Sequence, residues 1–232
     1  MSLINVSNLT FSYEGSYDNI FENVSFQIDT DWKLGFIGRN GRGKTTFLNL
    51  LLGKYAYSGN ISSTVKFEYF PYDVEDKSLY TIEVMKSICT ECMDWEIFRE
   101  ISLLDVQEDA LYRPFNTLSN GEQTKVLLAA LFLTASCFLL IDEPTNHLDA
   151  FSREELENTL LNYSGTMLIV SHDRYFINKL ATRIVELTPE GCNNFLGNYD
   201  DYSEHRYVQA EEKVEKKKPK VNDYKLKKEN LL

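Results

Sequence analysis

Gly38-Arg39-Asn40-Gly41-Arg42-Gly43-Lys44-Thr45 is the stretch of sequence that decides the fold. It follows a short apolar run at residues 33–37, typical of a buried strand, and leads into residues 46–52, typical of a helix. A Gly-x4-Gly-Lys-Thr pattern between a strand and a helix predicts a loop whose backbone N–H groups surround phosphate oxygens. An accidental glycine-rich turn is the alternative, and the flanking strand and helix argue against it.

The side chains of this loop predict a nucleotide site. Lys44 is expected to reach the terminal phosphates, and the hydroxyl group of Thr45 is expected to ligate Mg²⁺. The residues expected to bind ATP here are Gly38, Asn40, Gly41, Gly43, Lys44, Thr45 and Thr46.

A second apolar run, residues 137–141, ends in Asp142 and Glu143. An unbroken apolar run is typical of a central parallel strand that is covered on both faces. Because ligands of open α/β sheets lie at the carboxyl ends of the strands, Asp142 is expected to hold Mg²⁺ and Glu143 to polarise the attacking water. The alternative, an acidic helix cap before Pro144, explains one carboxylate but not both.

Leu118-Ser119-Asn120-Gly121-Glu122-Gln123 precedes an apolar stretch, residues 126–133, that predicts a buried helix. A serine hydroxyl, a glycine and the unpaired N–H groups of a helix start suit an anion. The stretch resembles the signature motif of ATP-binding cassette (ABC) ATPases, with Asn120 where a glycine is commoner. The resemblance implies that Ser119, Gly121 and Glu122 close over the γ-phosphate held by a second, facing domain.

Three further residues take roles from this resemblance. His172, in Ser171-His172-Asp173-Arg174, follows an apolar strand where ABC ATPases have a switch histidine that contacts the γ-phosphate. Asp149 matches the loop through which paired domains communicate. Tyr13 matches the aromatic residue that stacks on adenine, and Phe11 and Tyr17 are alternatives for that role.

Longer motifs resemble the ABC-F subfamily, whose members carry two cassettes in one chain and act on ribosomes. These motifs are Glu-Pro-Thr-Asn-His-Leu-Asp at 143–149, Ser-His-Asp-Arg-Tyr-Phe at 171–176 and Gly-Asn-Tyr-Asp-Asp-Tyr at 197–202. Transport cassettes have a glutamine that touches Mg²⁺ and couples to the membrane domain; Tyr72 stands at that place here. This departure favours ABC-F and puts one Mg²⁺ contact in doubt.

The order of the predicted elements indicates an α/β fold: a P-loop ABC nucleotide-binding domain over residues 1–198. Strands within residues 3–28 predict an N-terminal antiparallel β subdomain, and residues 79–120 predict an α-helical lobe that carries the signature. Three apolar strands alternating with helices predict a parallel core sheet with helices on both faces; the strands are 34–37, 137–141 and 166–170, and the helices 44–52, 121–134 and 152–163. A hairpin is expected at 183–196, and residues 199–232 are expected to begin a truncated helical linker.

Composition agrees with a cytoplasmic domain that is not inserted in a membrane. The sequence has 232 residues, 43% of them hydrophobic, without a membrane-spanning run or a secretory leader. The net charge is −11; residues 211–232 hold eight lysines and five acidic residues, so residues 1–210 carry −14. An acidic cassette does not bind a nucleic-acid backbone by itself. The lysine-rich tail is either a solvated helix or a linker that faces RNA.

The four cysteines predict no metal site. Cys89 and Cys92 are spaced like half a metal or redox site, but no second pair accompanies them and they fall in an expected helix, residues 82–92. We expect these two residues, Cys137 and Cys192 to be reduced packing residues.

The sequence contains one copy of each motif, whereas an ABC site needs two halves. We therefore expect the N-terminal cassette of a longer ABC-F protein, an Mg²⁺-dependent ATPase that is weak alone. Its expected partners are a second cassette, from the same full-length chain or a homodimer, and the ribosome and tRNA through the linker. The compact lobe resembles that of the antibiotic-resistance, ribosome-protection branch. The alternatives are an ATPase subunit of a membrane transporter and, more remotely, a non-enzymatic binding module.

Overall fold

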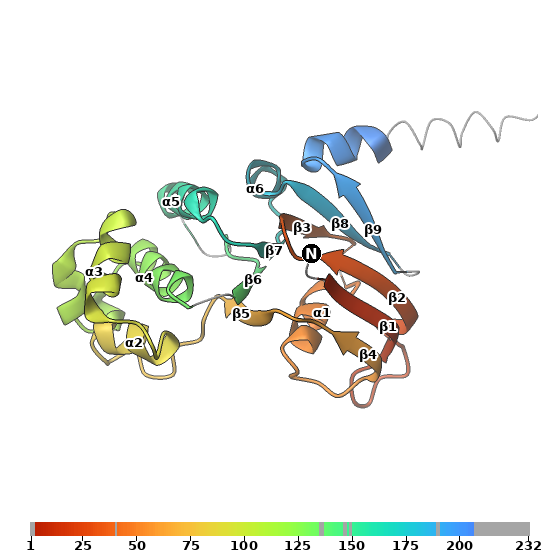
Figure 1. The fold of residues 1–232 in the computed structure, drawn as a ribbon, viewed down its shortest axis with the longest axis horizontal. Coiled ribbons are helices and arrows are strands. Elements are labelled where there is room, and N and C mark those ends of the chain that lie inside the picture. The colour runs from red at the N-terminus through yellow and green to blue at the C-terminus, as the bar shows by residue number, and fades with distance from the viewer. Residues whose placement is uncertain are drawn as a thin grey trace, which may run out of the picture.

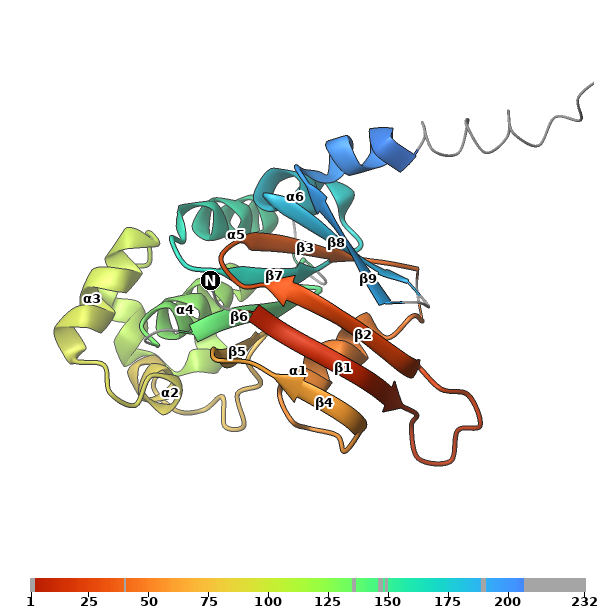
Figure 2. The same cartoon turned by 45° about the vertical axis from the view of Figure 1, so that its right-hand side comes forward.

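The computed structural model describes residues 3–39, 41–134, 137–145, 148, 150–188 and 191–206. Its described strands form two sheets, one three-stranded with the order β2-β1-β4 and one six-stranded with the order β5-β6-β7-β3-β8-β9. Helices α2, α3 and α4 gather at one end of the molecule, away from the three-stranded sheet (Figures 1 and 2). The architecture confirms the predicted α/β class, with a parallel core, an antiparallel subdomain and a helical lobe.

The three-stranded sheet is antiparallel throughout. β1 (Leu3–Phe11) pairs on one side with β2 (Phe21–Asp29) and on the other with β4 (Ser58–Ser62). Alternate side chains of β1 are buried, as expected for a sheet with one covered face. The alternation resumes after a register shift near Leu9, so β1 continues to Phe11.

The core of the larger sheet is parallel. β7 (Met167–Val170) lies between β3 (Lys33–Ile37) and β6 (Cys137–Asp142), and β5 (Lys66–Phe70) flanks β6. Phe36 and Asp142 both pair with Val170, so β3 and β6 end at the same level. The phosphate loop, the carboxylates of Asp142 and Glu143 at the end of β6 and the histidine after β7 therefore emerge at one edge of the sheet.

Helix α1 (Lys44–Leu51) fills the space between the two sheets. Its Phe47 is fully buried, and the ring lies 5.3 to 6.3 Å from the rings of Phe21, Phe26 and Phe36. Burying an aromatic side chain of this size contributes about 2–3 kcal/mol. One face of the parallel sheet is thus covered by α1 and the antiparallel sheet rather than by helices alone.

The helical lobe contacts the opposite face. It comprises α2 (Thr81–Ile88), α3 (Asp94–Leu103), two 3₁₀ turns and α4 (Asn120–Phe132), and α5 (Ala150–Asn162) packs against α4. The predicted helix at 82–92 is wrong at its end: α2 stops at Ile88, and Cys89 leaves the helical region with φ −101° and ψ 84°. All four cysteines are free, and the described residues include no cluster of three or more His, Cys, Asp or Glu arranged for a metal ion.

The last described residues form a hairpin and a short helix. β8 (Arg183–Thr188) pairs antiparallel with β9 (Gly191–Leu196), as predicted. Residues 199–206 are helical, and Tyr202 packs, 7% exposed, against a small cluster that includes Ile37 and Ile177. The lysine-rich tail lies outside the described residues. Among the described helices, none is both long and apolar enough to cross a bilayer.

Helix α6 (Arg174–Leu180) rests on β3 at Gly35. A Cβ atom on Gly35 would lie 2.7 Å from Cγ2 of Ile177 and 2.9 Å from Cδ1 of Ile184. We expect Gly35→Ala to lower the free energy of unfolding by about 1–3 kcal/mol, because these core side chains must shift. Urea denaturation measures the loss. In a Gly35→Ala/Ile177→Ala double variant the loss should be smaller than the sum of the single losses; simple additivity would contradict this account of the packing.

Candidate functional site

A cleft of about 370 Å³ opens at the carboxyl edge of the parallel strands. Its wall combines the phosphate loop, the start of α1, the residues after β6 and β7, and the loop after β1. The lining residues are Tyr13, Ile20, Gly41, Gly43, Lys44, Thr45, Thr46, Glu143, Val170 and His172. The structure therefore brings together side chains that lie up to 159 positions apart in the sequence.

Two glycines give the phosphate loop its shape. Gly41 and Gly43 have φ angles of 75° and 86°, in the left-handed region that favours glycine. A Cβ atom on Gly43 would lie 2.4 Å from Cγ2 of Ile20, whereas a Cβ atom on Gly41 would meet nothing within 4 Å. Gly43 is thus required by packing, and Gly41 borders open space on the cleft side. Asn40 lies outside the described residues.

Lys44 is buried at the start of α1, and its Nζ donates a hydrogen bond of 3.1 Å to the carbonyl oxygen of Gly38. Burial lowers the pKa of the lysine, and the nearby carboxylates of Glu143 and Asp142 partly offset that effect. An ammonium group that is partly stripped of water and held at the loop gains strongly from a bound phosphate.

Asp142 is held by two hydroxyl groups. Thr45 Oγ1 donates to Oδ1 at 3.2 Å, and the Tyr69 hydroxyl donates to Oδ2 at 3.1 Å. Hydroxyl and carboxylate oxygens are the ligands that Mg²⁺ prefers, and Mg²⁺ in nucleotide sites takes its other ligands from water and phosphates. Asp142 and Thr45 therefore fit the predicted metal-binding role. The sequence analysis missed Tyr69, because its contact with Asp142 depends on the pairing of β5 with β6.

The side chains of Glu143 and His172 contact each other at the cleft. Glu143 has a φ of 47°, and its N–H donates to the Val170 carbonyl at 2.8 Å. Its Oε2 accepts the backbone N–H of His172 at 3.1 Å, and its Oε1 lies 3.2 Å from His172 Nε2. Oε1 is buried, yet no group in the described part of the chain gives it a hydrogen bond of good geometry. A carboxylate oxygen in this state is suited to accept a bond from water.

Tyr13 is the aromatic residue that lines the cleft. Its hydroxyl lies 2.8 Å from Thr46 Oγ1, and its ring is 41% exposed. Of the two alternatives, Phe11 is buried and Tyr17 is fully exposed, and neither lines the cleft. Stacking of Tyr13 on adenine stays a prediction.

The signature residues lie away from this cleft. Ser119 caps α4: its N–H and hydroxyl group both donate to Glu122 Oε2 at 2.8 Å, and its Oγ accepts from the Glu122 N–H at 3.2 Å. Gly121 allows α5 to approach, because a Cβ atom there would lie 3.0 Å from Ser152 Oγ. None of the three is among the residues that line the phosphate cleft.

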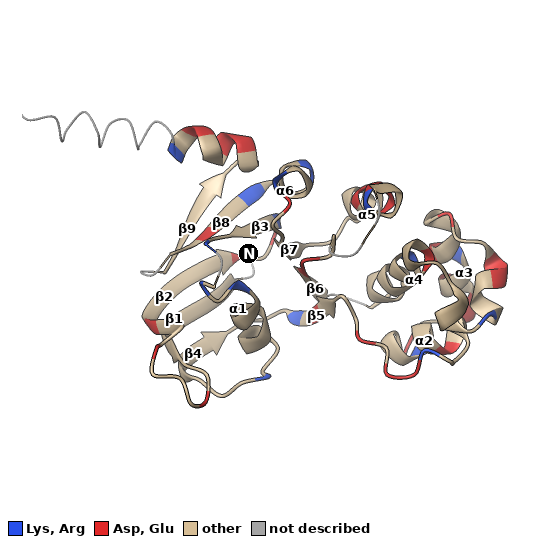
Figure 3. Cartoon of the chain, turned by 180° about the vertical axis from the view of Figure 1, so that it is seen from behind, with Lys and Arg blue, Asp and Glu red and all other residues tan. Residues whose placement is uncertain are grey.

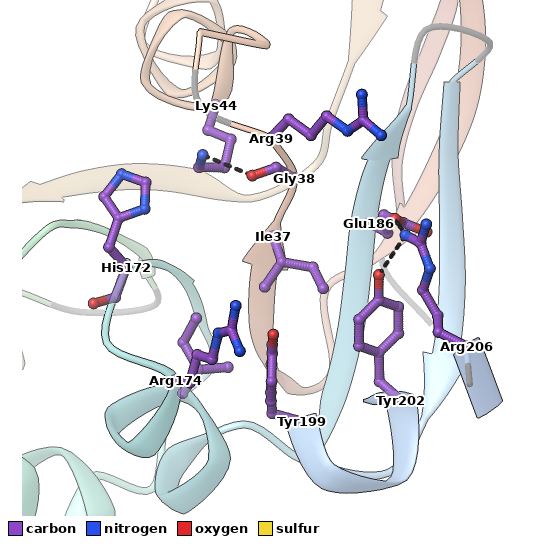
Figure 4. Close-up of a pocket in the computed structure, with 12 residues that line it drawn as sticks. Ile37, Gly38, Arg39, Lys44, His172, Arg174, Glu186, Tyr199, Tyr202 and Arg206 are labelled. Carbon is purple, nitrogen blue, oxygen red and sulfur yellow. Dashed lines mark hydrogen bonds and ion pairs between the residues drawn. The ribbon is translucent and has the colours of Figure 1, made fainter. Parts of the chain in front are cut away.

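A second cavity of about 480 Å³ adjoins the first and shares Lys44 and His172 with it (Figure 4). Arg39 and Arg174 line it, and the helical turn at 199–206 borders it through Tyr202 and Arg206. Arg206 pairs with Glu186 and also donates to the Tyr202 hydroxyl at 2.9 Å. The start of the predicted linker thus contacts β8 through the pair of Arg206 with Glu186.

Figure 3 marks charged residues along the ribbon: acidic residues occur on α3 and α5, and basic residues occur near the start of α1 and on α6. The basic groups flank the proposed phosphate site. Asp149 lies outside the described residues, so its role stays a prediction.

The fold and this cleft define a P-loop ATP-binding cassette. A protein-family model described as ABC transporter matches residues 21–146, more than half of the chain. The chain therefore belongs to the ABC transporter family of ATP-binding domains, and membership implies ATP binding and hydrolysis. A solved metal-chelate type ABC transporter in an inward-facing conformation shares the fold, with a TM-score of 0.70 and 20% identity over 87% of this chain and 85% of that chain.

Similar curated proteins indicate which branch of the ABC family this chain resembles. ABC transporter F family member 5 of Arabidopsis thaliana is 32% identical over 95% of this chain and 33% of its own length. The ribosome protection protein VmlR of Bacillus subtilis is 34% identical over 84% of this chain and 36% of its own length. These relatives favour an ABC-F ATPase over a subunit of a membrane transporter. The chain spans about a third of their length.

The capping box of α4 gives a testable pH dependence. The hydrogen bonds from Ser119, its backbone N–H first, lower the pKa of Glu122 below its ordinary 4.5. A carboxyl group with a lowered folded-state pKa stabilises the fold above pH 4.5, and this stabilisation is lost as pH falls through the folded-state value.

We expect Ser119→Ala to cost about 1 kcal/mol in urea denaturation at neutral pH. Glu122→Gln should lower Tm at neutral pH, and its difference from the unmutated protein should shrink below pH 4.5. Glu108→Gln, an exposed control, should show neither effect. A Glu122→Gln difference independent of pH would contradict the capping account.

Proposed function

We propose that this chain binds Mg-ATP in the cleft at residues 41–46 and hydrolyses it as one half of a paired ABC site. The observation that carries the proposal is the convergence of Lys44, Asp142, Glu143 and His172 at the ends of three parallel strands. In this proposal the phosphate-loop amides and Lys44 hold the phosphates, and Tyr13 stacks on the base. A bound Mg²⁺ would neutralise charge on the β- and γ-phosphate oxygens, with Asp142 and Thr45 as its protein ligands.

Glu143 is the proposed general base. Its Oε1 is buried without a good donor among the described residues, which leaves it able to accept a proton or a hydrogen bond from the attacking water. His172 lies beside that oxygen and is proposed to contact the γ-phosphate. The hydrogen bond that the backbone N–H of His172 donates to Glu143 Oε2 fixes the orientation of the carboxylate.

The second half of the site is proposed to come from a facing cassette. Ser119, Gly121 and Glu122 do not line the cleft of their own chain, and the hydroxyl of Ser119 is engaged in its helix cap. A facing copy, or a second cassette of a longer chain, would present its signature to the γ-phosphate. The residues expected at 199–232 to form a linker would join two such cassettes.

The ribosome is the proposed site of action. Support comes from the F-branch relatives, one of which carries ribosome protection in its name. In this proposal, paired cassettes close on ATP in the cytoplasm, place the linker near the tRNA sites, and release after hydrolysis. Antibiotic resistance through ribosome protection is the proposed biological outcome.

Replacing the general base tests the chemistry. Glu143→Gln should retain ATP binding and lose about 10²–10³-fold in turnover, because the positioned base is removed while the phosphate contacts remain. Phosphate release from the paired cassettes measures turnover. Size-exclusion chromatography in the presence of ATP measures dimer formation. Glu108→Gln is the matched control. Turnover of Glu143→Gln at the unmutated rate would show that Glu143 is not the base.

Co-sedimentation tests the partner. The full-length protein carrying Glu143→Gln should pellet with ribosomes in the presence of ATP and stay in the supernatant with ADP. The expected cause is that the blocked site holds the closed, ATP-bound pair. Equal pelleting with both nucleotides, or none with either, would contradict the ribosomal proposal while leaving ATP binding intact.

A further inference from the structure

Tyr69 contacts the proposed metal-binding carboxylate from the neighbouring strand. On β5, Tyr69 pairs with Leu140 of β6, two positions before Asp142. Its hydroxyl donates to Asp142 Oδ2 at 3.1 Å, while Thr45 donates to Oδ1 at 3.2 Å. Each carboxylate oxygen therefore has a donor from a different element, one from β5 and one from α1. Such a pair of bonds fixes the plane of the carboxylate.

The phenol is suited to a permanent donor role. Tyr69 is half-buried and packs against the core between the two sheets, and Lys54 Nζ lies 4.9 Å from its ring centroid. A phenol with the ordinary pKa of about 10 keeps its proton throughout the neutral range, so the hydroxyl group stays a hydrogen-bond donor.

Tyr72 occupies a different environment. It is half-buried and packs against the cluster that joins the parallel sheet to the helical lobe, and it is not among the residues lining the phosphate cleft. The residue that stands where transport cassettes have a glutamine therefore packs into the core shared by the sheet and the lobe. The phenol that reaches the carboxylate lies three positions earlier.

We propose that Tyr69 is a positioning residue that orients the Asp142 carboxylate for the divalent cation of the nucleotide site. The inference deepens the proposed function and rests on it. Groups that hydrogen-bond a metal-binding carboxylate fix its orientation, and their removal typically weakens metal binding about 10–100-fold.

The test measures cation binding rather than turnover. Mn²⁺ is titrated into the nucleotide-loaded protein and followed by its electron paramagnetic resonance signal. Tyr69→Phe should raise the Mn²⁺ Kd about tenfold or more. Nucleotide affinity measured in EDTA should stay unchanged. The matched control Tyr72→Phe removes the same atom from a phenol outside the cleft, and it should leave both affinities unchanged.

A double-mutant cycle identifies the route of the effect. In an Asp142→Ala background, Tyr69→Phe should have no further effect on Mn²⁺ binding, because the carboxylate it orients is gone. Unchanged or tighter Mn²⁺ binding in Tyr69→Phe, or an undiminished effect in the Asp142→Ala background, would overturn the inference. Loss of cooperative thermal unfolding in Tyr69→Phe would also overturn it, because the hydroxyl would then be needed for folding.

The unmutated protein separates this inference from the proposed function. If it takes up no nucleotide and no nucleotide-dependent Mn²⁺, the proposed function fails and the inference falls with it. If it binds both and only Tyr69→Phe departs from expectation, the proposed function stands and the inference alone is rejected.

Discussion

Parallel pairing of β3 and β6 on either side of β7 is the constraint on which the site depends. Because Phe36 and Asp142 both pair with Val170, the phosphate loop and the two carboxylates leave the sheet at the same level. A shift of β6 by one residue against β7 would turn Asp142 to the opposite face of the sheet, and a shift of β3 would move the phosphate loop out of level with it. The hydrogen bond from Thr45 to Asp142 joins α1 directly to the end of β6 and ties the loop to this register.

Two hydrophobic cores hold that sheet in place, and they serve different parts of the site. The core on one face, around Phe47, fixes α1 beneath the phosphate loop. The core on the other face, around Val126 and Leu128, joins the sheet to the lobe that presents the signature. Both cores contain side chains from β6, so the strand that leads to Asp142 and Glu143 is anchored on both sides. The small cluster around Tyr202 adds a third contact, which holds the helical residues 199–206 against Ile37 of β3.

Motifs with strict spacing were predictable from the sequence, because their chemistry requires particular residue types at particular positions. The phosphate loop, the strand ending in Asp142 and Glu143, and the strand before His172 are all present as expected. The alternation of apolar strands and helices also predicted the parallel core. Local pattern alone failed at the end of α2, where apolar residues continue past Ile88 although the helix does not.

Contacts between neighbouring strands were harder to predict. The contact of Tyr69 with Asp142 depends on the pairing of β5 with β6, which no local pattern specifies. The choice of Tyr13 over Phe11 as the cleft residue likewise depends on which side chains the antiparallel sheet buries. The signature residues do not line the phosphate cleft of their own chain, and their local geometry shows only the cap of α4.

Calorimetric titration with a non-hydrolysable ATP analogue tests the central claim most directly. The account predicts a single nucleotide site per chain whose affinity is increased by Mg²⁺ and lost on Lys44→Ala, because the ammonium group is the buried cation of the phosphate loop. Nucleotide uptake that is indifferent to both Mg²⁺ and Lys44→Ala would contradict it, since the nucleotide would then bind elsewhere than at the edge formed by β3, β7 and β6.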